Sequence, residues 1–268
     1  MAVDTLQKLI DGLQNRYILT FYKASIGNMI TGQLGTRWGG NGSPSPGEIP
    51  TSAVVCDSNT LGSWKLPPAP SGSDMYIAEI KVSQFVLGQF ILFDRLAHMG
   101  GLVGNITTEQ IIDLDVSIAA YQGRCDVSGS GVLWALETYT NLGATATTAT
   151  VTYTNESDVS GRITTVTIPA TMRVGSIWPI LPNDNDNLIK SIQSIQLTSS
   201  TGTAGNFGIT ARVRIAEVPI DSTNKNFLAD YAMLALPKLV GTECLEICMV
   251  CGATSQGVLV GNAAIIRN

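Results

Sequence analysis

The sequence is poor in charge, in histidine and in long apolar runs. Only 14% of its 268 residues are charged, against about 25% in ordinary soluble domains. Its longest apolar stretches, such as residues 90–93, fall far short of the roughly 20 residues that cross a bilayer. The formal net charge is -5 and no run of Lys or Arg occurs, whereas affinity for nucleic acid comes mainly from neutralised phosphates. We therefore expect neither a membrane nor a nucleic acid as partner.

Cysteine is scarce and does not form the pattern of a disulfide framework. The first residues also lack the basic head and apolar core of a secretory signal, so we expect synthesis in the cytosol and reduced thiols. Cys244, Cys248 and Cys251 have the spacing of an iron–sulfur radical enzyme, but they lie in a strand-like stretch. On a strand, the first two would face one side and Cys251 the other. This favours buried thiols and predicts no metal and no cofactor.

Candidates for catalysis are equally few. His98 is the single histidine, and Asp94 precedes it by four residues, but no Gly-x-Ser-x-Gly elbow accompanies them. The stretch around His98 favours a strand end and a turn, with a structural histidine. Asp184 and Asp186 are oxygen ligands that calcium accepts, yet no EF-hand pattern follows, which favours a solvated turn. We therefore predict no catalytic residue and no enzymatic activity.

Residues 4–14 are the strongest helix candidate, because four apolar side chains recur at helical spacing: Leu6, Leu9, Ile10 and Leu13. Asp4 followed by Gln7 predicts an N-cap with a capping box. A helix this short is marginal alone in water. Its apolar stripe must therefore pack on the body of the protein or on a neighbouring subunit.

Glycine and proline gather between residues 31 and 74, with Trp38 and Trp64 among them. A long segment without regular structure is uncommon in a compact domain unless it binds something. We interpret residues 1–74 as a helix followed by an extended Gly/Pro-rich arm, and residues 75–268 as a separate body. This division predicts that the body stays folded when residues 1–74 are removed.

The body has the alternating, β-branched pattern of strands, in residues 76–82, 88–94, 132–139, 148–153, 161–168 and 208–215. Short helices are expected near residues 108–114 and 225–236. A final strand pair is expected at residues 242–250 and 257–266. Short strands with frequent turns predict a mainly β fold, with a body like a β-sandwich or jelly roll.

Three stretches, residues 91–102, 135–155 and 194–208, resemble a group of tailed-bacteriophage virion structural proteins. The resemblance covers roughly residues 75–219. It implies a structural role in the virion, as a capsid decoration or cement protein, and it transfers no site residues.

The resemblance and the neutral composition together predict a non-enzymatic protein at the capsid surface that bridges subunits of the major capsid protein. We also expect a homo-oligomer, with a trimer as one arrangement. The expected interface anchors are Trp38, Trp64 and the helix stripe Leu6, Leu9, Ile10 and Leu13, because buried aromatic anchors dominate interface energetics. The alternative for these residues is that they fold back on their own sandwich. Two other functions stay open, namely a tail, collar or head–tail joining protein and a glycan-binding or hydrolytic receptor module.

Overall fold

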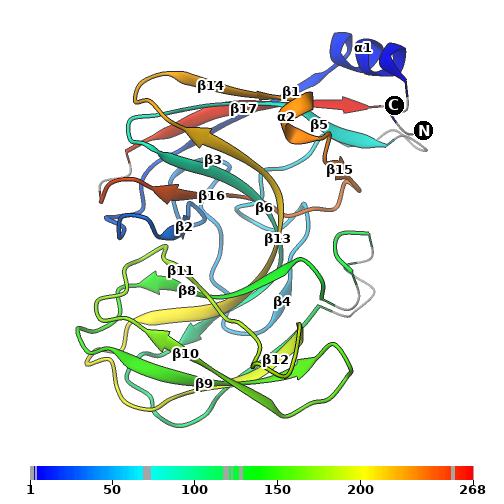
Figure 1. Ribbon diagram of the computed structural model, residues 1–268. Coiled ribbons are helices and arrows are strands. Elements are labelled where there is room, and N and C mark those ends of the chain that lie inside the picture. Colours follow the sequence, from blue (N-terminus) through cyan, green and yellow to red (C-terminus); the bar gives the residue numbers. More distant parts are fainter. Residues whose placement is uncertain are drawn as a thin grey trace.

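The computed structural model describes residue 3 and residues 5–68, 74–116, 121, 123–126, 129–254 and 257–267. Three antiparallel sheets lie one above another, and the first and last described strands pair with each other in the upper sheet (Figure 1). Apolar side chains fill the two spaces between the sheets. The predicted mainly β fold, with a sandwich-like body and a short N-terminal helix, is confirmed.

The upper sheet combines strands from both ends of the chain. Its order is β14 (Asn226–Asp230), β5 (Met75–Gln84), β17 (Leu259–Arg267), β1 (Tyr17–Lys23) and β3 (Gly42–Ser43), and β15 (Lys238–Leu239) also pairs with β5. The C-terminal strand β17 therefore lies between β5 and β1.

The middle sheet contains the two longest strands. Its order is β11 (Ile177–Pro179), β8 (Val132–Thr140), β13 (Asn206–Ile220), β6 (Gly88–Leu102), β16 (Leu245–Cys251) and β2 (Leu34–Thr36), and β4 (Val54–Val55) also pairs with β6. The ladder between β6 and β13 shifts register at three places. Such irregularities bend a strand pair, and one part of β6 packs upward while the other packs downward.

The lower sheet closes the sandwich. Its order is β10 (Arg162–Ile168), β9 (Thr147–Asn155), β12 (Ile189–Leu197) and β7 (Gln110–Asp115). Alternate residues of β9 are buried, because every second side chain of a strand faces the core. Leu96 and Leu102 of β6 belong to this lower core, whereas Phe90 and Leu92 belong to the upper one. The long strands thus join both cores into one body.

Helix α1 (Leu6–Gln14) lies on the outer face of the upper sheet. Its N-cap is Thr5, whose hydroxyl accepts the N–H of Lys8 at 3.3 Å. The predicted cap Asp4 lies outside the described residues. Gln7 does not complete a capping box, because its side-chain amide donates to Asp11 instead.

Four expectations about local structure are wrong in whole or in part. Residues 110–114 of the first expected short helix lie in strand β7, and residues 226–230 of the second form β14, with helix only in α2 (Tyr231–Leu234). Strands β16 and β17 exist but do not pair with each other: β16 pairs with β6 and β2, and β17 pairs with β5 and β1. The expected turn around His98 lies inside β6. In each case, a non-local strand partner overrides the local pattern.

The Gly/Pro-rich arm packs on its own chain. It contributes β2, β3 and β4 to two sheets, and Trp64 and Leu66 to the upper core. Lys23 of β1 fixes it in place: the buried ammonium donates to the carbonyl oxygens of Gly40 at 2.6 Å and Pro44 at 3.2 Å. Burial lowers the pKa of Lys23 to about 8. The described part of residues 1–74 therefore shares its core with the strands that follow.

Candidate interaction surface

The two tryptophans proposed as anchors are buried within this chain. Each is only 2% exposed. The indole N–H of Trp38 donates to the Glu48 carbonyl, and that of Trp64 donates to the Thr20 carbonyl, both at 2.9 Å. Trp64 also packs edge-on against Phe21, with ring centroids 5.0 Å apart. For these two residues, the structure shows the alternative in which they fold back on their own sandwich.

In the helix stripe, some residues pack on the chain's own sandwich and others are exposed and free to contact a neighbouring subunit. Leu9 is buried against Tyr76, Ala78 and Ile266 of the upper sheet, and Leu13 packs at the border of this cluster. Leu6 is 70% exposed and Ile10 is 39% exposed. The helix is therefore held to the sheet by one part of its stripe and presents the other part to solvent.

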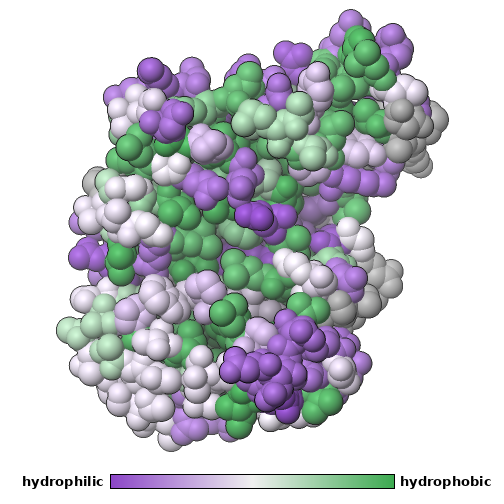
Figure 2. Space-filling view, in the orientation of Figure 1, coloured by the Kyte–Doolittle hydropathy of each residue, from purple (hydrophilic) through white to green (hydrophobic). Residues whose placement is uncertain are grey.

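Exposed apolar side chains continue from the helix onto the upper sheet. Ile18 and Tyr22 of β1 pair with Ala264 and Val260 of β17. Ala264 and Val260 lie on the same face of β17 as Ile266, which the helix covers. Ile18 and Tyr22 therefore face the same side of the sheet as the helix. We call Leu6, Ile10, Ile18, Tyr22 and Val260 the outer apolar patch. Figure 2 shows apolar side chains exposed on α1 among polar ones. Along the strands, Thr20 and Asn262 separate Ile18 from Tyr22 and Val260, so the patch mixes apolar and polar side chains. Exposed apolar groups gathered on one face mark contact sites more often than scattered single residues do.

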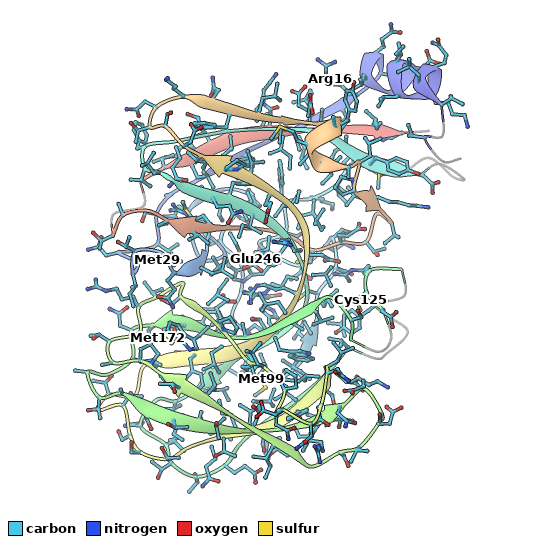
Figure 3. The ribbon with its side chains drawn as sticks, viewed as in Figure 1. Arg16, Met29, Met99, Cys125, Met172 and Glu246 are labelled. Carbon is cyan, nitrogen blue, oxygen red and sulfur yellow. The ribbon has the colours of Figure 1, made fainter. Side chains whose placement is uncertain are left out.

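Beneath the arm, the middle sheet carries a buried cluster of four charges, one from each of four adjacent strands: Arg95, Glu137, Arg212 and Glu246. Arg95 donates to Glu137 at 2.7 Å and to Glu246 at 3.1 Å. Arg212 donates to Glu246 at 2.7 Å and also contacts Glu137. Figure 3 places Glu246 in the interior of the molecule. Two positive and two negative groups cancel, which is what permits their burial.

Electrostatics inside this charge cluster keep Arg95, Arg212 and Glu246 ionised. Burial opposes the charged form of Glu246, but Arg212 and Arg95 outweigh it and hold the pKa of Glu246 well below its usual range. Arg95 and Arg212 likewise keep their protons, because the two glutamates raise their pKa against the effect of burial. The hydroxyl of Thr36, from the arm, also donates to Glu246. The cluster therefore holds the arm against the middle sheet.

His98 is a structural histidine. Its Nδ1 accepts hydrogen bonds from Arg95, at 3.1 Å from Nε and 2.8 Å from Nη2. Burial, reinforced by the charge of Arg95, lowers the pKa of His98 to about 2, so the ring is neutral. Asp94 does not orient it, because that carboxylate pairs with Arg124 at 2.5 and 2.8 Å. Asp94 and His98 thus do not form the base of a catalytic triad.

The cysteine and aspartate candidates also have structural surroundings. Cys244, Cys248 and Cys251 are free and buried, with Cys244 beside Cys56 and Trp38. The predicted solvated turn at residues 183–187 is better ordered than expected: the carboxylate of Asp186 is 3% exposed and accepts from Arg162 at 2.8 Å and from Asn155 at 2.7 Å. The hydrogen bond from Arg162 lowers the pKa of Asp186 to about 2. Among the described residues, no group of three or more His, Cys, Asp or Glu side chains is arranged to hold a metal ion.

A groove of about 550 Å³ lies where the sandwich opens between β10 and β11. One wall is β10 itself, and the other is formed by residues 178–184, including Trp178, Leu181 and Asn183. We call this the β10 groove. Leu181 is 69% exposed and Ile163 of β10 is 54% exposed, so both walls present apolar side chains to solvent.

Comparison with known proteins identifies no family. No protein-family model matches the chain, and no curated protein matches it. The solved structure of the D431N mutant VP2 protein of infectious bursal disease virus, from derived T=1 particles, aligns with 9% identity and a TM-score of 0.18, over 100% of this chain and 85% of that chain. A TM-score this low establishes no shared fold. The described residues contain no helix long and apolar enough to span a bilayer.

The charge cluster and the β10 groove are the two features that sequence patterns do not reveal. Arg95, Glu137, Arg212 and Glu246 are far apart in the chain, and each sits in a strand-like stretch where one charged residue looks like an outward-facing position. The one available signal is that Glu137, Arg212 and Glu246 have apolar or small residues on both sides, which indicates strands buried on both faces; Arg95 follows Asp94 and lacks this signal.

Proposed function

We propose that the chain is a non-enzymatic virion structural protein that decorates or cements a tailed-phage capsid by bridging subunits of the major capsid protein. The observation that supports the proposal is that many of the charged side chains are buried inside the protein. Of the 37 charged residues in the chain, nine of those described are buried: Lys23, Arg37, Asp94, Arg95, Arg124, Glu137, Arg212, Glu243 and Glu246. Charged residues are rarely buried in ordinary domains. The surface that remains is rich in Thr, Ser and Asn.

A neutral, β-rich surface suits repeated contact between subunits. Such a surface can bind without long-range electrostatic attraction, and it avoids the desolvation cost of burying charges at an interface. The rigid sandwich presents this surface without the entropy cost of ordering loops on binding. Resemblance of residues 75–219 to tailed-bacteriophage virion proteins supports the same role. The capsid exterior is the location we propose, following synthesis in the host cytoplasm.

The outer apolar patch is the surface that we assign to capsid attachment. Leu6 and Ile10 on the helix, and Ile18 and Tyr22 on β1, are exposed, although Leu9 secures the helix and Phe21 secures β1 by burial in the upper sheet. Central apolar anchors surrounded by polar groups are the usual composition of a binding site. The patch therefore replaces the tryptophans as the proposed contact.

Co-sedimentation with capsids that lack this protein tests the assignment. We expect the wild type to sediment with capsids and the double variant Leu6→Asp, Ile10→Asp to bind at least about tenfold more weakly, which is about 1.4 kcal/mol. Ile111→Asp is the matched control, because Ile111 is 63% exposed on the lower sheet. Equal loss of binding by both variants would contradict the assignment of the patch.

The location of the protein in a reconstruction of the virion tests the role itself. We expect density for this fold at repeated positions over the capsid lattice. Density confined to the tail or neck would refute decoration and support a tail, collar or head–tail joining protein. Binding to host glycans without affinity for capsids would instead support a receptor module.

A further inference from the structure

Strand β10 forms one edge of the lower sheet, and this edge lacks the usual protection against pairing. Its seven residue pairs with β9 show no register shift, and it carries neither proline nor lysine. Natural edge strands are usually shortened, bulged or charged to prevent such pairing. Its one charged residue, Arg162, is already paired with Asp186.

The opposite edge of the same sheet is protected. Strand β7 shifts register against β12, and it carries Asp113 and Asp115. Asp113 has a left-handed backbone, with φ of 56°, which disrupts a regular edge because side chains disfavour that conformation. One sheet therefore has a blocked edge and an open one.

The backbone groups of β10 that face outward can be assigned from one hydrogen bond. The carbonyl of Ile163 accepts from the side chain of Asn183 at 3.1 Å, so it points away from β9. Outward groups alternate along an antiparallel edge, and hence the N–H and C=O groups of Thr165 and Thr167 point the same way. In the part of the chain that the structure describes, no hydrogen bond to these four groups is found.

The segment bearing Asn183 does not fill this edge. The main-chain N–H of Asn183 donates at 3.0 Å to the hydroxyl of Tyr153, a residue that points into the lower core. The segment therefore runs along the core side of the lower sheet. The hollow left beside β10 is the β10 groove, lined by Leu181 and Trp178.

We propose that β10 pairs antiparallel with β10 of a second copy of this chain, about a two-fold axis through Thr165. Thr165 is the middle residue of β10, so an axis at this position gives the longest overlap of the two strands. This register sets Thr165 opposite Thr165, Ile163 opposite Thr167 and Arg162 opposite Ile168, so no like charges meet. The N–H of Thr167 from the second copy would take the place of the Asn183 side chain at the Ile163 carbonyl. Apart from Arg162, every residue of β10 is an uncharged Ile, Thr or Val, so the strand can meet a second copy of itself without charge repulsion. Leu181 of each copy would be covered by the other.

Two sheets of four strands would then form one continuous sheet across the dimer. A two-fold contact closes on itself, so it yields a dimer, which is a homo-oligomer but not a trimer. The inference adds an interface to the proposed function without depending on it, because the β10 edge lies on the lower sheet and the outer apolar patch on the upper one.

Sedimentation velocity over a concentration series tests the pairing. We expect the wild type to pass from monomer to dimer as its concentration rises. Thr165→Lys and Thr165→Glu should each be monomeric, because like charges face each other on the axis. An equimolar mixture of the two variants should restore the dimer. Thr165→Val is the matched control and should dimerise like the wild type, since the contacts come from the backbone.

The position of Thr165 on the exposed edge keeps these variants foldable, which circular dichroism verifies. Amide exchange gives a second measurement on the wild type: the N–H groups of Thr165 and Thr167 should be protected in the dimer and should exchange rapidly on dilution. A wild type that stays monomeric at all soluble concentrations would overturn the proposal. An oligomer that persists in folded Thr165→Lys would overturn it as well. Failure to bind capsids would leave the dimer unaffected, so the two proposals fail separately.

Discussion

The guanidinium of Arg95 lies over the indole of Trp38, with its central carbon 4.4 Å from the ring centroid. Trp38 also meets His98 edge-on, at 5.7 Å between centroids. The arm thereby places a large aromatic surface over the charge cluster and excludes water from it. A cation–π contact at a desolvated site is worth about 2 kcal/mol, in addition to the apolar burial of the ring.

Replacing Trp38 tests whether the arm is part of the fold. Trp38→Ala should lower the free energy of unfolding by about 3–5 kcal/mol, as for other buried tryptophans, measured by urea denaturation. Trp38→Phe keeps the ring but loses the hydrogen bond to Glu48, and it should cost clearly less. If Trp38→Ala unfolds like the wild type, the tryptophan is not an internal anchor.

The charge cluster should be sensitive to the loss of a single member. Glu246→Gln leaves Arg95 and Arg212 facing only one carboxylate, and breaking a buried pair in this way costs about 3–5 kcal/mol. Glu217→Gln is the matched control, because the pair of Arg214 and Glu217 is largely exposed and such pairs contribute at most about 1 kcal/mol. Equal costs for the two variants in urea denaturation would contradict the burial of the cluster.

Acid should destabilise the protein through His98. The folded state keeps this ring neutral down to about pH 2, whereas the unfolded chain takes up a proton below about pH 6.5. The unfolded state then binds more protons, so stability falls as the pH falls through 6.5. The loss should be about 1.4 kcal/mol per pH unit below that point.

Comparison with His98→Gln isolates this effect. Gln still offers an acceptor to Arg95 but does not titrate. The difference in free energy of unfolding between wild type and variant should be constant above pH 7 and should shift by about 2 kcal/mol between pH 6.5 and pH 5. The free energy of unfolding of the wild type should fall relative to that of the variant. Parallel stability curves over this range would show that His98 is protonated in the folded state.

The thiols should be inert until the protein unfolds. Four of the five cysteines are buried and Cys125 is half-buried. Burial raises the pKa of Cys125 and of Cys251 to about 11, which leaves little thiolate to react at neutral pH. Titration with an aromatic disulfide reagent should therefore be slow in buffer and should give five thiols per chain in urea. Rapid reaction of the native protein would contradict this.

Sequence patterns predicted the strands better than their partners. Alternating residues locate β9 and β10, because one face of each strand meets a core and the other does not, whereas β8 is buried on both faces. Strands β7 and β14 have the local pattern of helices, since they are short and gain their conformation from β12 and β5. The charge cluster could not be predicted, because only the topology brings its four strands side by side.

The candidate site is predictable only in part, because the sequence pattern gives the helix stripe but not what each of its residues contacts. Helical spacing correctly identified the stripe of α1, and the structure then divided it between Leu9, which is buried, and Leu6, which is exposed. Composition alone marked the arm as unusual but gave no means of telling an external contact from an internal one. Trp38 and Trp64 illustrate this, since a large aromatic in a loop suits both.

Truncation distinguishes the two interpretations of the N-terminal region. The sequence predicted that residues 75–268 would fold alone, but Phe21, Trp64 and Leu66 belong to the upper core, and β1 pairs with β17 along its whole length. We therefore expect removal of residues 1–74 to abolish cooperative thermal unfolding. Removal of residues 1–14 takes away only α1, whose main buried contact is Leu9. That variant should fold with a loss of about 2–3 kcal/mol, the value of one or two buried apolar side chains, and circular dichroism with thermal melting checks both outcomes. A cooperative transition in the longer truncation would show that the arm and the upper core are independent.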